Sequence, residues 1–305
     1  MLSRLLPRKI NDWQLYLFLL PSLVYIIIFA YIPMAGVQIA FKDYNFVIGI
    51  WDSAWVGLKH FERFMDSYLF SQILWNTLSI SLYSHVIGFS LPIVFALILN
   101  AFINQRFKKI VQTVSYMPHF ISTVVIVGML VQLFNPRTGA FGNLYMMFTN
   151  TVMTDLLGNK DAFQHLYVWS GIWQGLGWGS IIYIAALSSV DEHLHEAAQI
   201  DGASRFQRVI HIDFPSILPT ATILLILSVG SMMDVGFEKV FLMQNELNLS
   251  KSEVISTYVY KVGLTTGTGN FSYAAAIGLF NSVINFILLI IVNYAARKWG
   301  QTSLW

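Results

Sequence analysis

Six long stretches of this chain contain no Asp, Glu, Lys or Arg, and they constrain the possible folds more than any other feature. The shortest has 20 residues, and a helix of that length crosses a hydrocarbon core of about 30 Å. Only 11% of the residues are charged, whereas soluble domains carry about 25%. The sequence therefore predicts an all-α, polytopic membrane helix bundle, with six transmembrane helices over residues 13–41, 67–105, 110–136, 162–190, 214–233 and 262–296.

The charged residues between these stretches predict the orientation of the bundle. If the N-terminus lies inside, the inner segments hold 10 basic and 6 acidic residues, and the outer segments hold 8 basic and 10 acidic residues. Because basic residues near span ends stay on the cytoplasmic side, we expect both termini in the cytoplasm. The first apolar run has 29 residues and lacks a clear small-x-small cleavage site, so we expect it to remain as the first span and not to be removed as a signal peptide.

The polar segment between the fourth and fifth spans has the pattern of a short helix. Ser189 followed by Glu192 is a capping-box spacing, which predicts a helix that starts near Val190. Gly202 is expected to end this helix or turn it, since glycine is favoured at helix ends. The spacing places three residues inward: Leu194, Ala197 and Ala198.

A second short helix is expected directly after Gly202. It covers residues 204–212 and carries Phe206, Val209 and Ile210 on one side. Pro215 is expected to close the segment and to open the next span. Two short helices joined by a Gly turn form a knob that fits a cleft of a soluble protein, and an ordinary amphipathic loop is the alternative.

Residues 191–215 also contain a specific spacing. They read Glu196-Ala197-Ala198, three residues, Gly202, nine residues, Ile212, one residue, and Phe214-Pro215. This spacing resembles the cytoplasmic coupling loop of bacterial ABC importer permeases, with Phe214 where Leu is usual. The segments SGIWQGLGWGSIIYIAAL from Ser170 and GFEKVFLMQN from Gly236 are similar to carbohydrate-uptake ABC transporter permeases, in the LplB-like branch related to the maltose permease.

This resemblance implies a type I ABC importer permease fold with three parts. Residues 1–70 would hold an N-terminal cytoplasmic segment, the first transmembrane helix and an outer loop. Residues 71–298 would form the ABC importer transmembrane domain with its coupling loop at 191–215, and residues 299–305 a C-terminal tail. The localisation that follows is the bacterial cytoplasmic membrane, crossed several times.

The resemblance also implies partners and a function. The chain would be the transmembrane permease subunit of an ATP-driven oligosaccharide importer, with complex or acidic glycan fragments as its substrates. It would form half of the translocation pathway with a second, homologous permease subunit. An ABC ATPase dimer would bind ATP and Mg, an extracytoplasmic solute-binding protein would deliver the oligosaccharide, and the chain itself would bind no cofactor.

Two sets of site residues follow from matching this sequence to the family. The ATPase-coupling residues would be Glu196, Ala197, Ala198, Asp201, Gly202 and Pro215. The substrate pathway would be lined by Gln174, Gly175, Trp178, Ser228, Ser231, Met232 and Val235. Of the pathway residues, only Gly175 and Ser228 keep the residue type of the maltose permease, whose asparagines are replaced by Met232 and Val235, so a maltose-like substrate is not expected.

Polar and small residues within the predicted spans have a packing interpretation beside the functional one. Polar groups in lipid face protein or a water-filled cavity, and the candidates are Asn76, His85, Gln132, Gln174, Ser228, Ser231, Asn281 and Asn285, with Asp234 at a span end. Amides beside aromatic rings such as Trp173 could hold a sugar, while hydrogen bonding between helices is the alternative. Gly171, Gly175 and Gly179 lie four residues apart, which predicts close helix packing.

Other chemistry finds little support in the sequence. There is no G-x-x-x-x-G-K-[ST] motif for ATP phosphates, which indicates a transport subunit without its own ATPase site and not an enzyme. His193 and His195 lie two residues apart on a helix, a poor spacing for a metal site. A net charge of +2 does not indicate a nucleic-acid partner. A membrane enzyme acting on lipid-linked sugars and a secondary sugar carrier are the alternative functions.

Overall fold

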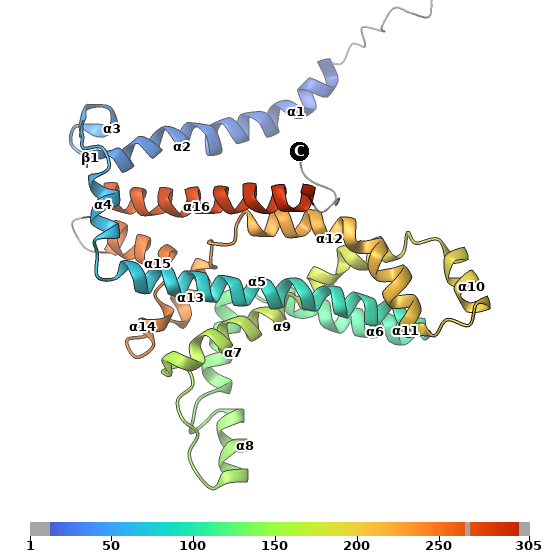
Figure 1. The fold of residues 1–305 in the computed structure, drawn as a ribbon. Helices are drawn as coiled ribbons and strands as arrows, with labels where there is room; N and C mark the ends of the chain where they lie inside the picture. Colours follow the sequence, from blue (N-terminus) through green and yellow to red (C-terminus); the bar gives the residue numbers. More distant parts are fainter. Residues whose placement is uncertain (1–12, 266–268, 299–305) are drawn as a thin grey trace, which may run out of the picture.

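The fold is built from long helices that run side by side (Figure 1). A computed structural model describes residues 13–265 and 269–298. The first 12 residues of the predicted cytoplasmic segment and the predicted tail 299–305 lie outside the described residues. The longer helices in chain order are α1 (Trp13–Ile26), α5 (Phe70–Ala101), α6 (Gln105–Tyr116), α7 (Thr123–Leu133), α8 (Ala140–Thr149), α9 (Lys160–Leu187), α12 (Phe214–Val229) and α16 (Phe271–Lys298).

Shorter elements lie at the two ends of this arrangement. At one end, which we name the hairpin end, are β1 (Lys42–Asn45), α3 (Gly49–Asp52), β2 (Ser53–Trp55), α4 (Lys59–Met65), α13 (Phe237–Met243), α14 (Leu249–Ser252) and α15 (Ile255–Tyr260). At the opposite end, the coupling end, are α10 (Glu192–Ile200) and α11 (Arg205–Arg208). α5 runs between the two ends with α9 along it, while α16 runs from the hairpin end to the middle and α12 from the middle to the coupling end (Figure 1).

Four helices of the described residues are long and apolar enough to cross a membrane: Tyr16–Phe41, Phe70–Ala101, Arg205–Val229 and Phe271–Lys298. A fifth span is possible if Gln105–Phe120 and Thr123–Leu133, which meet at 99°, count as one broken span. The predicted fourth span corresponds to α9, which has 28 residues but is not among the apolar helices because glycine, serine and tryptophan lower its hydropathy. Six spans are therefore not confirmed by length and composition, although a helix lies in each predicted range.

The first span is a continuous helix with changing geometry. After α1 come a π-helical turn (Ile27–Tyr31), α2 (Ile32–Met34) and a 3-10 segment (Ala35–Phe41). None of the residues in its most apolar window is buried, so most of its surface is free to contact lipid or another chain. The 3-10 segment packs against α16.

A small β-hairpin interrupts the otherwise helical fold. β1 and β2 pair antiparallel, with Lys42 opposite Trp55. Lys42 is buried, and its ammonium group donates to the carbonyls of Ile50 and Trp51 at 2.8 and 2.9 Å. The sequence prediction of an all-α fold missed this hairpin, because each strand is too short to show an alternating pattern.

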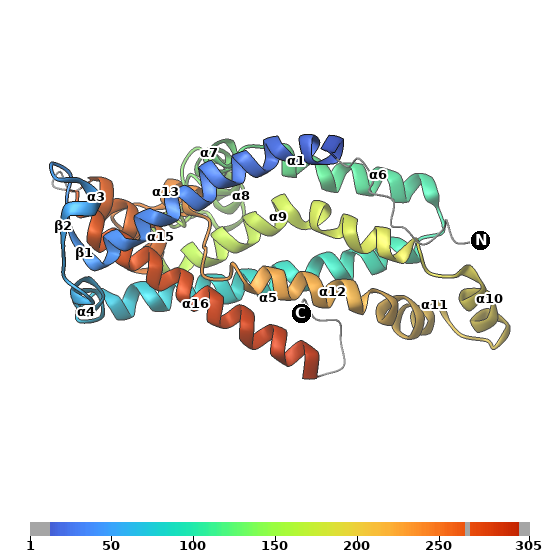
Figure 2. The ribbon, with the colours of Figure 1, turned by 90° about the horizontal axis from the view of Figure 1, so that it is seen from above.

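The core of the coupling half joins three helices. α5 packs along α9, and α12 packs against both α9 and α16 (Figure 2). The buried residues between α5, α9 and α12 are Ile93, Ala96, Tyr183, Leu187, Ile217 and Ala221. Two further clusters fill the hairpin end, one around Phe163 and Val240 and one around Phe64 and Ile277.

The closest glycine contact in α9 is not in the predicted stripe. A Cβ atom at Gly177 would lie 2.2 Å from the backbone oxygen of Ser115, so α6 crosses α9 there with almost no space between the backbones. A Cβ at Gly175 would have no atom within 4 Å. The prediction that Gly175 serves close packing was therefore wrong for the described chain, and the residue borders open space instead.

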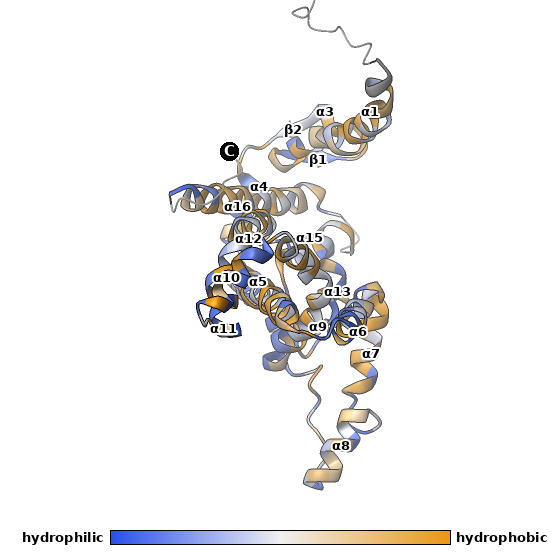
Figure 3. Cartoon of the chain, turned by 90° about the vertical axis from the view of Figure 1, so that its right-hand side faces the viewer, coloured by the Kyte–Doolittle hydropathy of each residue, from blue (hydrophilic) through white to orange (hydrophobic). Residues whose placement is uncertain are grey.

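One helix stands away from the bundle. α8 points away from the other helices, and its residues are mainly hydrophobic (Figure 3). Met147 and Phe148 at its end are 77% and 81% exposed. In a membrane protein, such a surface suits contact with lipid or with another subunit.

Candidate functional site

The first helix of the predicted coupling loop begins two residues later than expected. α10 starts at Glu192, and its N-cap is Asp191, whose carboxylate accepts a 3.0 Å hydrogen bond from the backbone N–H of His193. The hydroxyl of Ser189 instead donates to the carbonyl of Ala186. The predicted Ser189 cap was wrong because the preceding helix α9 still uses this residue, and Asp191 is as good an N-cap.

Gly202 ends α10, as the sequence predicted. Its backbone φ is +79°, a left-handed conformation that glycine adopts at low cost. The N–H groups of Asp201 and Ala203 donate to the carbonyls of Ala197 and Ala198, at 3.0 and 2.8 Å. These bonds close the free carbonyl end of the helix in the way that a left-handed cap does.

The second helix of the loop is continuous with the next span. Ser204 caps α11 through a capping box with Gln207, so its start was predicted correctly. However, α11 continues through a π-helical turn (Val209–Asp213) into α12, which gives one helix over Arg205–Val229. Pro215 does not close the segment, because it lies in the first turn of α12, where proline is tolerated.

A buried polar contact joins α10 to the bundle. Asp213 is 3% exposed, and its carboxylate lies 3.2 Å from Nε2 of His195 on α10. The side-chain amide of Asn100 on α5 donates to the same carboxylate at 3.3 Å. These three residues fix α10 and α11 relative to α5. The sequence reasoning missed their contact, since 113 residues separate Asn100 from Asp213.

The outer surface of the loop is exposed. Glu196, Ala197, Asp201 and Gly202 are exposed, and Ala198 is half-buried. Leu194 is 52% exposed and Ala197 is exposed too, so the predicted inward positions of these two residues were wrong. Ile200 and Phe206 are 87% and 73% exposed. Apolar side chains among carboxylates on a projecting knob suit contact with a protein surface.

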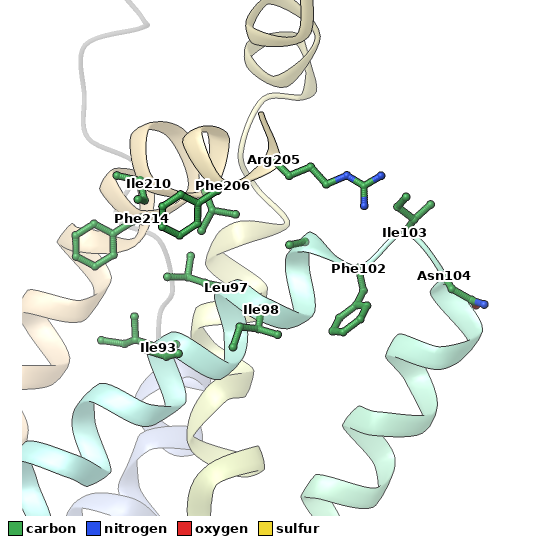
Figure 4. A pocket seen from close by; sticks show the side chains of 13 residues that line it. Ile93, Leu97, Ile98, Phe102, Ile103, Asn104, Arg205, Phe206, Ile210 and Phe214 are labelled. Carbon is green, nitrogen blue, oxygen red and sulfur yellow. The ribbon is translucent and has the colours of Figure 1, made fainter. Parts of the chain in front are cut away.

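A groove beside this knob separates the end of α5 from α11 and α12. Its volume is about 1040 Å³. Ile93, Leu97 and Ile98 of α5 point toward Phe206, Ile210 and Phe214, while Arg205 extends toward Ile103 (Figure 4). The predicted common side of Phe206, Val209 and Ile210 is confirmed, since all three line the groove.

Two of the predicted pathway residues line a cavity between α5, α9 and α13. Gln174 and Gly175 border a cavity of about 300 Å³, together with Gly171, Gly179 and Lys239. The amide of Gln174 donates to the carbonyl of Ile121 at 3.0 Å. The amide nitrogen of Gln174 is thus bonded to the protein itself. Gly171, Gly175 and Gly179 leave open space along one face of α9.

Two other predicted pathway residues lie in a neighbouring cavity nearer the coupling end. Trp178 and Ser228 line a cavity of about 430 Å³, which shares Gly88, Pro92 and Gly179 with the first. The Trp178 ring stacks on His119, with ring centres 4.4 Å apart and an angle of 1°. The structure therefore brings four of the seven predicted pathway residues into two adjoining cavities.

The remaining three lie in the turn that follows α12. Ser231 is exposed and Met232 is half-buried. Val235 is 7% exposed and packs in the cluster with Val127 and Phe163, so its side chain does not reach an open cavity in this conformation. The amide oxygen of Asn285 accepts a 2.8 Å hydrogen bond from the N–H of Met233, which holds the turn against α16.

Several polar candidates have structural partners. Asn76 is buried and donates to the carbonyls of Ser250 and Glu253. His85 contacts the carbonyl of Ser228 at 3.1 Å. For these two residues the packing interpretation is confirmed. Among the described residues, no group of three or more His, Asp or Glu side chains could hold a metal ion.

The sequence matches known transport proteins over nearly its whole length. Residues 88–301 match the family described as binding-protein-dependent transport system inner membrane component. Protein LplB of Bacillus subtilis (strain 168) is 42% identical over 294 residues, which cover 96% of this chain and 92% of the relative. The polygalacturonan/rhamnogalacturonan transport system permease protein YteP of the same organism is 40% identical over 303 residues, covering 99% and 94%.

The fold is also similar to that of a solved structure. A chain in the crystal structure of a bacterial alginate ABC transporter, in complex with an alginate pentasaccharide-bound periplasmic protein, has a TM-score of 0.88 and 35% sequence identity. The match covers 96% of the present chain and 97% of the other. The similarity thus extends over both the hairpin end and the coupling end.

Proposed function

Since the chain belongs to the family of binding-protein-dependent transport system inner membrane components, we propose that it is the permease subunit of an ATP-driven ABC importer for oligosaccharides. It forms half of the translocation pathway, and a second, homologous permease subunit forms the other half. The transported oligosaccharides are acidic glycan fragments. Relatives that are 40% and 35% identical carry polygalacturonan/rhamnogalacturonan and alginate in their names, which supports this substrate class.

The observation that carries the proposal is the exposed knob at the coupling end. α10, the Gly202 turn and α11 project from the bundle with exposed carboxylates and apolar side chains (Figure 1). The knob docks in a cleft of an ABC ATPase dimer through Glu196, Ala197, Ala198, Asp201 and Gly202. Closure of the ATPase dimer around ATP and Mg draws the two coupling loops together, and the helices turn the pathway from one side of the membrane to the other.

The pathway lies along α9 and the end of α12. Gln174, Gly175, Trp178 and Ser228 border cavities there. Trp178 offers a ring face for the C–H surface of a sugar, while amides and hydroxyls bond its oxygens. An extracytoplasmic binding protein delivers the oligosaccharide at the hairpin end, and the coupling end and both termini face the cytoplasm.

Reconstitution tests the function directly. Proteoliposomes that contain both permeases and the ATPase should take up an oligogalacturonate only when ATP and the binding protein are supplied. A proton uncoupler should leave this uptake unchanged. Uptake that continues without ATP and collapses with the uncoupler would instead indicate a secondary carrier.

Cysteine labelling tests the orientation, because the sequence contains no cysteine. A Gln199→Cys variant should react with a membrane-impermeant maleimide only in inverted vesicles, since Gln199 is exposed on α10. An Asp52→Cys variant at the hairpin end should react only in intact cells or right-side-out vesicles. The opposite pattern would refute the proposed coupling role of α10.

A further inference from the structure

Lys239 is a buried lysine without a carboxylate partner among the described residues. It lies on α13, is 8% exposed, and borders the cavity that contains Gln174 and Gly175. Its ammonium group donates one hydrogen bond to the carbonyl of Tyr167, at 2.9 Å, and lies 4.9 Å from the centre of the Tyr167 ring. An ammonium group has three donors, so this contact uses one of them.

Other lysines at the hairpin end are better satisfied. Lys42 is buried but donates to two carbonyl groups, and Lys261 forms an ion pair with Glu253. A buried charge without a counter-charge is costly for a protein. The stability of the chain therefore does not explain why Lys239 is a lysine, whereas a negatively charged ligand in the cavity would.

The cavity has room for such a ligand beside the ammonium group. Its volume of about 300 Å³ is at the lower end of the range for small-ligand sites. The glycines on α9 keep it open, since a Cβ at Gly171 would lie 3.2 Å from Nζ of Lys239 and a Cβ at Gly175 would enter empty space. Gly171 and Gly175 are one helical turn apart, about 5–6 Å along the axis, so the open face leads from Lys239 deeper into the bundle.

We propose that Lys239 binds a carboxylate group of the oligosaccharide during its passage and thereby selects acidic sugars over neutral ones. This inference rests on the proposed function and adds the residue that recognises the charge. A charge-assisted hydrogen bond from the ammonium group to a uronate carboxylate would use the free donors. The contact is made inside the pathway, so it adds to the selection that the binding protein makes.

The ionisation of Lys239 gives the contact a pH dependence. Burial lowers the pKa of Lys239 to about 8, and a bound carboxylate would raise this pKa again because it stabilises the ammonium form. Uptake of an acidic sugar should therefore weaken as the pH rises above about 8. Tyr167 faces Lys239 from α9, and Glu238 precedes it on α13.

The other two elements that pack against α13 add few charges. α7 contains no titratable side chain, and α15 contributes Tyr258 and Tyr260. The Tyr260 ring contacts Phe237 and Phe241. The pH dependence of uptake is therefore expected to reside on Lys239.

The test uses the whole importer in proteoliposomes with its binding protein. The probes are a galacturonate trisaccharide to pentasaccharide and its methyl ester, which has the same sugars without the negative charge. Lys239→Met should raise the KM for the acidic probe at least tenfold, and Lys239→Arg should restore much of the loss. Lys251→Met at the same end is the control and should stay within twofold of the wild type, since Lys251 is a half-buried lysine that forms no ion pair within the described part of the chain.

The outcomes separate the inference from the function. If the wild type takes up the acidic probe and Lys239→Met does so with an unchanged KM and pH profile, the inference is wrong and the function stands. Loss of uptake together with an equal loss of ATPase stimulation by the empty binding protein would show a structural role and would also overturn the inference. If the wild-type importer takes up neither probe, the acidic-glycan function itself fails.

Discussion

Gly202 offers the sharpest test of the coupling knob, since its role depends on its left-handed backbone conformation and not on the room available for a side chain. Its φ is +79°, and a Cβ added to it would have no atom within 4 Å in the isolated chain. Gly202→Ala would therefore meet no clash but would strain the left-handed turn. Gly202→Asn is the matched variant, because asparagine is larger than alanine but tolerates this conformation.

The expected size of the effect follows from the conformational preference. A non-glycine residue in the left-handed region costs about 1–2 kcal/mol. This amount lowers the population of the docking-competent turn by a factor of about 5–30. Because Gly202 is exposed and lies outside the buried core, insertion and thermal unfolding of the bundle should stay unchanged.

The assay is ATP hydrolysis stimulated by the sugar-loaded binding protein, in proteoliposomes of matched permease content. Gly202→Ala should lose about 5–30-fold of this activity, and Gly202→Asn should keep most of it. Equal losses in the two variants would show that side-chain bulk at the ATPase contact, and not the backbone conformation, decides the activity. Normal activity in Gly202→Ala would refute the role of the turn altogether.

Three further predictions concern stability. Gly177→Ala should destabilise the permease by about 1–3 kcal/mol or more, because the new Cβ would lie 2.2 Å from the carbonyl oxygen of Ser115. Thermal unfolding in detergent measures this change. The control variant Gly175→Ala places its Cβ in open space and should leave thermal unfolding unchanged. Asp213→Ala should cost about 1–3 kcal/mol, because it leaves its half-buried partners on α5 and α10 without an acceptor, and proteolysis at α10 should become faster. Burial lowers the pKa of Lys239 from 10.5 to about 8. Between these two pH values the folded protein therefore binds fewer protons than the unfolded chain, and the free energy of unfolding should rise as the pH rises from 8 to 10.5. The Lys239→Met variant should lack this rise.

The helical membrane fold and the coupling turn were predictable because they depend on local or compositional signals. A run without charges specifies a span, and the turn at Gly202 follows from the preference of glycine for helix ends. The start of the second short helix at Ser204 was also predicted correctly. The cap at Asp191 was missed, since Ser189 and Asp191 are both suitable N-caps and the end of α9 decides between them.

The long-range contacts of the site could not be predicted. The carboxylate of Asp213 meets Asn100 from a helix more than a hundred residues earlier, and no local pattern in the sequence links them. The tight crossing at Gly177 and the open space at Gly175 differ in their neighbours and not in their residue type. The burial of Lys239 was missed for a related reason, because α13 is short and lies in a segment predicted as an outer loop.

The continuity of the helix over Arg205–Val229 explains how the knob and the pathway can move as one. Its 25 residues span about 37 Å at 1.5 Å per residue, which joins α11 at the coupling end to Ser228 at the cavity. A break at Pro215 would make a hinge there, and motion of the knob would be lost before it reached the cavity. The π-helical turn before Pro215 keeps the helix continuous, while Asp213 ties the same turn to α5 and α10. We therefore expect a displacement of the knob to reach both walls of the proposed pathway, through α12 directly and through α5 by the contact at Asp213.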